Sequence, residues 1–135
     1  MKPELRNKDS GTALDRYKKS FFHAIDGMIY AWKNEHNIMI IFFFTIFIII
    51  SGFVFKINSM EWLFCIFEIE AIIVVEFINS AIEAIVDLAS PKIHPLAKIA
   101  KDTASSATLI LCISAFVGGV VIFLPKVINV LMEVL

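Results

Sequence analysis

The chain has 135 residues, of which 59% are hydrophobic and 19% are charged, and its formal net charge is −1. An average soluble domain is about 45–50% apolar and about 25% charged, and a short chain buries only a modest share of its surface, so this composition disfavours a soluble monomer and excludes intrinsic disorder. The near-neutral charge, with a pI near 6.3, lacks the basic excess typical of nucleic-acid-binding proteins, so no nucleic-acid partner is expected.

The first predicted element is an amphipathic helix over residues 14–36, which follows a flexible N-terminal segment of residues 1–13. Apolar residues recur in it at steps of three and four, namely Leu14, Tyr17, Phe21, Phe22, Ile25, Met28, Ile29 and Trp32. This spacing is typical of a surface helix that lies in the membrane interface. A helix packed on a soluble partner would show the same stripe and stays open as the alternative.

Three apolar segments follow, over residues 38–55, 62–88 and 103–124, and each is about long enough to cross a bilayer as a helix. The first and third carry no charged side chain, whereas the second carries several carboxylates. A breaker cluster at residues 90–95 separates the second and third segments. The sequence therefore predicts an all-α integral membrane fold with three transmembrane helices. Cys65 and Cys112 both lie inside apolar runs and are interpreted as small hydrophobic residues rather than a disulfide or a metal site.

The distribution of lysine and arginine predicts the orientation of the chain in the membrane. Ten of the twelve precede the first apolar segment or lie between the second and the third. By the positive-inside rule, these regions face the cytoplasm. The prediction is a multi-pass protein of the cytoplasmic membrane with a cytoplasmic N-terminus and an extracytoplasmic C-terminus.

The carboxylates of the second segment share one helical face. At about 100° per residue, the residues on this face form a polar stripe that rises about 16 Å toward the cytoplasmic end. The polar stripe consists of Glu76, Asn79, Ser80, Glu83 and Asp87. Three further polar residues, Glu35, Lys101 and Asp102, stand where the neighbouring segments begin on the same side. Several carboxylates, a lysine and an asparagine are therefore expected to meet at the cytoplasmic membrane surface.

Ionisable groups inside a membrane are costly and are functional hypotheses by default. Clustered carboxylates can bind Mg²⁺ together with phosphate groups, and one of them can act as a general base for a lipid hydroxyl. Both roles suit phosphoryl transfer from a nucleotide to a lipid. Polar contacts that hold an oligomer together, and an ion- or proton-conducting oligomer, remain as alternatives. Glycine-rich motifs of soluble nucleotide-binding folds are absent from the sequence.

Residues 76–87, EFINSAIEAIVD, match every defining position of E-x-x-N-[ST]-[SA]-x-E-x-x-[VT]-D, the signature of the bacterial integral-membrane diacylglycerol kinase family. Residues 31–35 and 100–102 add further matches, and the similarity covers about residues 14–125. Other stretches, at residues 61–62, 94–98 and 122–126, resemble the Gram-positive branch, whose known members act mainly as undecaprenol kinases.

The resemblance implies a single membrane kinase domain over residues 1–135, assembled as a homotrimer whose active sites are shared between protomers. Its expected partners are ATP, a lipid alcohol and the bilayer, with Mg²⁺ as the cofactor. The reaction implied is transfer of the γ-phosphate of ATP to undecaprenol, which gives undecaprenyl phosphate for carrier-lipid recycling in cell-wall synthesis. Diacylglycerol, which would give phosphatidic acid, is the alternative acceptor.

The resemblance also implies roles for individual residues. Glu76 is the expected catalytic base, Ser105 is expected to face the lipid substrate, and Glu35 and Glu83 are expected to hold Mg²⁺ bound to ATP. Further nucleotide contacts are expected from Asn79, Asp87, Lys101 and Asp102, and from Arg16, His23 and His94. His23 is equally well interpreted as an ordinary histidine of the surface helix.

Glu68 and Glu70 depart from the family pattern because they lie deep in the second segment. They differ by about 200° around the helix, so both cannot join the polar stripe. We expect at least one of them to be neutral or to point into the core of the trimer, since burial favours the uncharged form of a carboxyl group. If neither is buried or paired, the predicted depth of this segment is wrong.

Overall fold

The computed structural model describes residues 12–92 and 94–134, all of whose regular elements are helices. The helices are α1 (Ala13–Asn34), α2 (His36–Val54), α3 (Ser59–Ala89) and α4 (Pro95–Val134). The all-α prediction is confirmed. Most of the predicted flexible segment, residues 1–11, lies outside the described residues. The chain divides into two units, one ending at Asn34 and the other beginning at Glu35.

The first unit is the amphipathic helix α1. Its start is capped reciprocally, because Thr12 Oγ1 accepts the N–H of Asp15 at 3.3 Å while Asp15 Oδ2 accepts the N–H of Thr12 at 3.0 Å. The Thr12 hydroxyl also donates to Asp15 Oδ2, at 2.7 Å, and this hydrogen bond, followed by the one from the Thr12 N–H, holds the pKa of Asp15 below its usual range. The predicted apolar stripe is exposed, with Tyr17 and Phe21 among its most accessible members. An uncovered stripe of this size needs an apolar environment from outside the chain.

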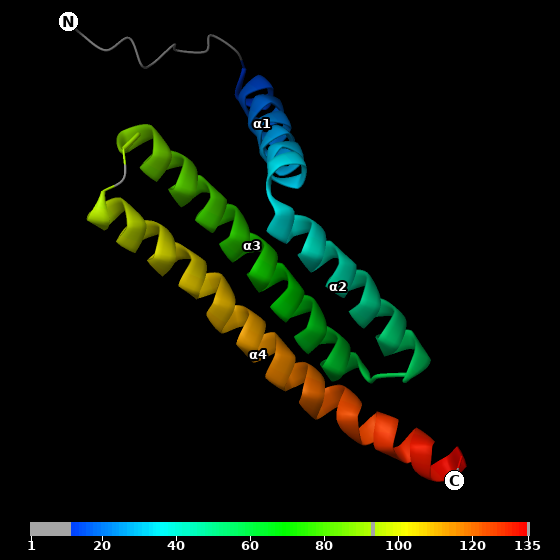
Figure 1. Cartoon of the computed structure of the whole chain (residues 1–135). Coiled ribbons are helices and arrows are strands. Elements are labelled where there is room, and N and C mark those ends of the chain that lie inside the picture. Colours follow the sequence, from blue (N-terminus) through cyan, green and yellow to red (C-terminus); the bar gives the residue numbers. More distant parts are fainter. Residues whose placement is uncertain (1–11, 93, 135) are drawn as a thin grey trace, which may run out of the picture. The chain divides into compact units, whose positions relative to one another are not determined.

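The second unit is built around α3, which runs alongside both α2 and α4 (Figure 1). A tight connection joins α2 to α3, and Lys56 in it has a positive φ of 49°. The connection ends at Asn58, whose side chain accepts the N–H groups of Met60 and Glu61, while Glu61 accepts the N–H of Asn58. This capping box satisfies N–H groups that the first turn of a helix leaves unpaired.

The breaker cluster predicted at residues 90–95 separates α3 from α4. Ser90 caps the end of α3, where its N–H donates a hydrogen bond to the backbone oxygen of Val86. Pro95 occupies the first position of α4. Proline is favoured there because the N–H it lacks has no partner in a helix start. His94 Nδ1 accepts the N–H of Leu96 at 3.2 Å, which satisfies one donor of the new helix.

A small apolar core lies where α2 turns into α3. Ile57, Cys65 and Ile122 are buried there, and Trp62 and Phe123 pack against them. Two glycines, Gly52 and Gly118, permit close packing next to it: a Cβ at Gly52 would lie 2.6 Å from the Trp62 ring, and one at Gly118 would lie 2.2 Å from the Phe64 ring. This core therefore joins the end of α2, the start of α3 and the part of α4 around Ile122, far from the polar stripe.

In the described part of the chain, α2 and residues 95–133 of α4 are long and apolar enough to cross a membrane. Helix α3 carries several carboxylates, so its composition is less typical of a membrane span than that of these two helices. With 31 residues, α3 nevertheless extends about 46 Å, which exceeds the thickness of a hydrocarbon core. Many large apolar side chains of α2 and α4, such as Phe43, Phe47 and Phe116, are exposed on the chain, as expected of lipid-facing surfaces.

Candidate active site

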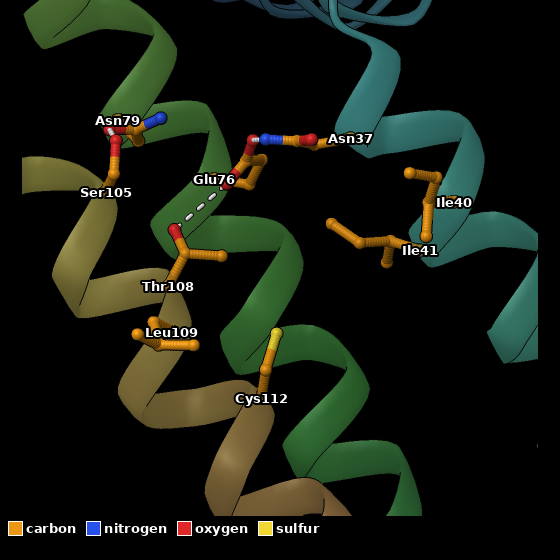
Figure 2. Close-up of a pocket in the computed structure, with 9 residues that line it drawn as sticks. All are labelled: Asn37, Ile40, Ile41, Glu76, Asn79, Ser105, Thr108, Leu109 and Cys112. Atoms are coloured by element: carbon orange, nitrogen blue, oxygen red, sulfur yellow. Dashed lines mark hydrogen bonds between the residues drawn. The ribbon is translucent and has the colours of Figure 1, made fainter.

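The most completely buried large side chain among the described residues is a carboxylate, that of Glu76 in the middle of α3, with 1% exposure. Both of its oxygens accept hydrogen bonds from the neighbouring helices. Asn37 Nδ2, at the start of α2, donates to Oε1 at 2.7 Å, and Thr108 Oγ1, on α4, donates to Oε2 at 2.9 Å. Figure 2 shows Glu76 between these two donors. A buried carboxylate requires such partners, because leaving it unsatisfied is expensive.

One turn further along α3, Asn79 is also buried and is hydrogen-bonded on both sides. Its amide nitrogen donates to Glu83 Oε1 at 3.2 Å, and its amide oxygen accepts the hydroxyl of Ser105 at 3.5 Å. Asn79 therefore orients the half-buried Glu83 while linking α3 to α4. Ser80 belongs to the same stripe, and its hydroxyl is buried without a hydrogen-bond partner in the described structure.

A pocket of about 260 Å³ opens beside Glu76 between α2 and α4 (Figure 2). Its polar lining comes from residues already described: Asn37, Glu76, Asn79, Ser105 and Thr108. The rest of its wall is apolar and consists of Ile40, Ile41, Leu109 and Cys112. A carboxylate at the edge of an apolar pocket is suited to a ligand that joins a hydroxyl group to a hydrocarbon chain.

Toward the end of α3, an ion pair between two predicted nucleotide residues joins α3 to α4. Lys101 Nζ lies 2.6 Å from Asp87 Oδ1, and Lys98 pairs with Asp102 within α4. The side chains of Asp87 and Asp102 are largely exposed, whereas the Lys101 side chain is only about one third exposed. This part of α3 and α4 extends beyond the start of α2 (Figure 1), so α2 does not cover it. Lys101 therefore contacts the polar stripe, at Asp87, within a single chain.

The remaining predicted site residues come from other segments of the chain. Glu35 is the single residue between α1 and α2; its backbone is extended and its side chain is half-buried. Arg16 and His23 are exposed on α1, which belongs to the other unit, and His94 is exposed in the connection before α4. Among residues 12–92 and 94–134, no three His, Cys, Asp or Glu side chains come together as a metal site.

Glu68 and Glu70, the two departures from the family pattern, have different environments. Glu68 is buried, with 7% exposure, and its Oε1 accepts the hydroxyl of Ser114 at 2.9 Å. Its Oε2 is buried without a hydrogen-bond partner in the described structure. Glu70 is exposed on the chain. One of the two is thus both buried and paired, so the condition that would have rejected the predicted depth of this segment is not met.

Sequence reasoning missed Asn37 and Thr108. Thr108 follows Ser105 by three residues and precedes Cys112 by four, so these side chains share one face of α4. Applying the periodicity used for the polar stripe to the third apolar segment would have revealed this face. Asn37 carries no comparable signal, because its partner is 39 positions away in the sequence.

Comparison with known proteins agrees with the signature. A family model described as prokaryotic diacylglycerol kinase matches residues 22–123. An undecaprenol kinase of Bacillus subtilis is 36% identical over 122 residues, which cover 90% of this chain and 99% of that protein. A diacylglycerol kinase of Helicobacter pylori is 39% identical over 105 residues, which cover 77% of this chain and 82% of that protein. The chain therefore belongs to the prokaryotic diacylglycerol kinase family.

Proposed function

We propose that this chain is a membrane lipid kinase that transfers the γ-phosphate of ATP to undecaprenol and so forms undecaprenyl phosphate. The observation that carries the proposal is the buried Glu76 carboxylate, held by two hydrogen bonds at the edge of a pocket with apolar walls. A general base must reach the proton it removes, and apolar walls suit the hydrocarbon next to that hydroxyl. The undecaprenol kinase that matches nearly along its whole length supports this choice of lipid.

In the proposed reaction, Glu76 takes the proton of the lipid hydroxyl as its O–H bond breaks. The lipid oxygen forms a bond to the γ-phosphorus, the bond from that phosphorus to the β–γ bridging oxygen breaks, and ADP leaves with the electron pair. Phosphoryl transfer requires little covalent chemistry from the protein, so the rate depends on positioning and on neutralising charge. Lys101 is the residue proposed to neutralise phosphate oxygens, and it would exchange part of its contact with Asp87 for them.

Mg²⁺ is implied by the family, and we assign Glu35 and Glu83 to hold it with ATP. The donor set fits this ion, because Mg²⁺ in nucleotide sites usually takes one or two protein carboxylates together with phosphates and water. The hydrogen bond from Asn79 to Glu83 supports the assignment, since metal-binding carboxylates are usually oriented in this way. When bound, the ion neutralises negative charge on the phosphates.

The proposed arrangement in the membrane has three spans, α2, α3 and α4, with α1 in the cytoplasmic interface, the N-terminus inside and the C-terminus outside. Packing of α3 against two apolar helices supports its place as a span, since its carboxylates need cover from neighbours. Three copies would assemble as a homotrimer with active sites shared between protomers. The exposed Glu70 supports assembly, because a carboxyl in the middle of a span is disfavoured against lipid.

Diacylglycerol is the second candidate acceptor. The Helicobacter pylori relative named diacylglycerol kinase is 39% identical to this chain, so the same chemistry on this lipid has direct support. The alternative from another functional class is a membrane oligomer that conducts ions or protons without a nucleotide.

The purified enzyme in detergent micelles, supplied with labelled ATP, Mg²⁺ and equal mole fractions of undecaprenol and diacylglycerol, tests the proposal. We expect labelled undecaprenyl phosphate, a larger kcat/KM for undecaprenol, and no turnover with Glu76→Gln, although this variant still binds ATP. A larger kcat/KM for diacylglycerol would transfer the assignment to that lipid. Ion flux across liposomes without ATP, together with absence of lipid phosphorylation, would overturn kinase function altogether.

A further inference from the structure

We propose that Asn37 and Thr108 are positioning residues that hold the Glu76 carboxylate in its reactive orientation; this inference rests on the proposed kinase function. The two donors come from different helices, α2 and α4, and neither belongs to α3, which carries Glu76. Each bonds a different carboxylate oxygen, at 2.7 and 2.9 Å. The plane of the carboxylate is therefore determined by the packing of all three helices of this unit.

The hydrogen bonds leave room for the chemistry. An ionised carboxylate has about four acceptor sites, two on each oxygen, and the two donors occupy one on each. The remaining sites are available to accept the proton of a hydroxyl group. Asn37, Glu76 and Thr108 all line the same pocket, so a lipid alcohol placed there meets the carboxylate and its two donors together (Figure 2).

Without these donors the carboxylate would lose its fixed direction. The glutamate side chain has several rotatable bonds, and the apolar pocket residues Ile41 and Leu109 offer no side-chain hydrogen-bond donors. The other two polar lining residues, Asn79 and Ser105, are hydrogen-bonded to each other. A displacement of a catalytic group by about 1 Å can cost about 100-fold in rate. Binding of ATP should not change, because neither donor is among the residues proposed to contact the nucleotide or its Mg²⁺.

The experiment compares Thr108→Val and Asn37→Leu with Thr108→Ser in the lipid kinase assay, measuring kcat and the KM for ATP separately. We expect Thr108→Val and Asn37→Leu each to lower kcat by about 10- to 100-fold while the KM for ATP stays within about twofold of the wild type. Thr108→Ser keeps the hydroxyl and should recover most of kcat. Circular dichroism and elution volume in detergent identify the variants that fold. If Thr108→Val does not fold, Asn37→Leu tests the positioning of the same carboxylate independently.

Two matched controls use similar residues that do not touch Glu76. Thr45 is also a helical threonine, but its hydroxyl donates to Ile41 O within its own helix at 2.9 Å, so Thr45→Val should leave kcat unchanged. Asn129→Leu makes the same change as Asn37→Leu, but at an exposed asparagine of α4. The inference is overturned if folded Thr108→Val and Asn37→Leu keep the wild-type kcat, if Thr45→Val loses as much, or if Thr108→Ser is as slow as Thr108→Val. Failure of the proposed function is recognised separately, as a wild-type enzyme that phosphorylates no lipid.

Discussion

Two buried glutamates of α3 differ in how completely their oxygens are hydrogen-bonded. Glu76 has a donor for each oxygen, whereas Glu68 has Ser114 for one oxygen and no partner for the other in the described structure. They lie eight residues apart, about 12 Å along the helix. The complete satisfaction of Glu76 suits a group that must stay in one place. The incomplete satisfaction of Glu68 makes its single donor important for stability.

Replacing Ser114 by alanine is expected to destabilise the protein. The variant would remove the donor of a carboxyl group that is 7% exposed, and an unsatisfied buried polar group costs about 1–3 kcal/mol. Thermal unfolding in detergent should therefore show a lower Tm. Ser106→Ala is the control, because the Ser106 hydroxyl donates to Thr103 O within α4 and is exposed, so its Tm should stay close to the wild type. Equal Tm values for both variants would contradict the importance of this contact.

The first turn of α3 is stabilised by charge as well as by its cap. Glu61 Oε2 accepts the N–H of Asn58 at 2.7 Å and lies 3.1 Å from Lys126 Nζ of α4. The backbone hydrogen bond, and to a smaller extent Lys126, hold the pKa of Glu61 below its usual range. One side chain thus caps α3 and ties it to α4 next to the apolar core.

These contacts predict a pH dependence of stability. Because the pKa of Glu61 is lower in the folded than in the unfolded chain, its contribution is fully present at neutral pH and is lost as the pH falls below about 4. The Tm of the wild type should therefore fall on acidification, and Glu61→Gln should show a smaller fall. Glu133→Gln, at an exposed position near the end of α4, should retain the wild-type pH profile. A Glu61→Gln profile that coincides with the wild type would contradict this role.

At the scale of the whole molecule, the chain leaves much of its apolar surface and one mid-helix carboxyl uncovered. The stripe of α1 is exposed, as are Glu70 and many large side chains of α2 and α4. A bilayer covers the apolar faces, and other copies of the chain are the proposed cover for Glu70. The proposed nucleotide residues of α1, Arg16 and His23, belong to a different unit from Glu76.

If α1 of one protomer completes the site of another, two defective variants should complement each other. Arg16→Ala is expected to weaken ATP binding, and Glu76→Gln to abolish the chemistry. Mixed trimers of the two, reassembled from dissociated subunits and assayed at low ATP, would contain some sites without either defect, so activity should rise above that of both parents. Mixtures that stay as inactive as the separate variants would show that each site is built within one chain.

Much of the fold and of the site follows from local pattern. Hydrophobic runs and three- or four-residue spacing predicted the helices, because burial of an apolar face repeats with the helical period. The polar stripe from Glu76 to Asp87 was predictable for the same reason, since all its members lie within three turns of one helix. The signature within that stripe was sufficient to indicate the family.

By itself, the sequence determined the helical class, the membrane environment, the carboxylates of α3 and the kinase family, because each depends on residues close together along the chain. Only the tertiary structure decided which groups touch Glu76, since Asn37 and Thr108 lie 39 and 32 positions away from it. It also decided that Glu68 turns inward to Ser114 while Glu70 stays exposed. Contacts between helices depend on how their faces pack, and that packing has no short-range signal in the sequence.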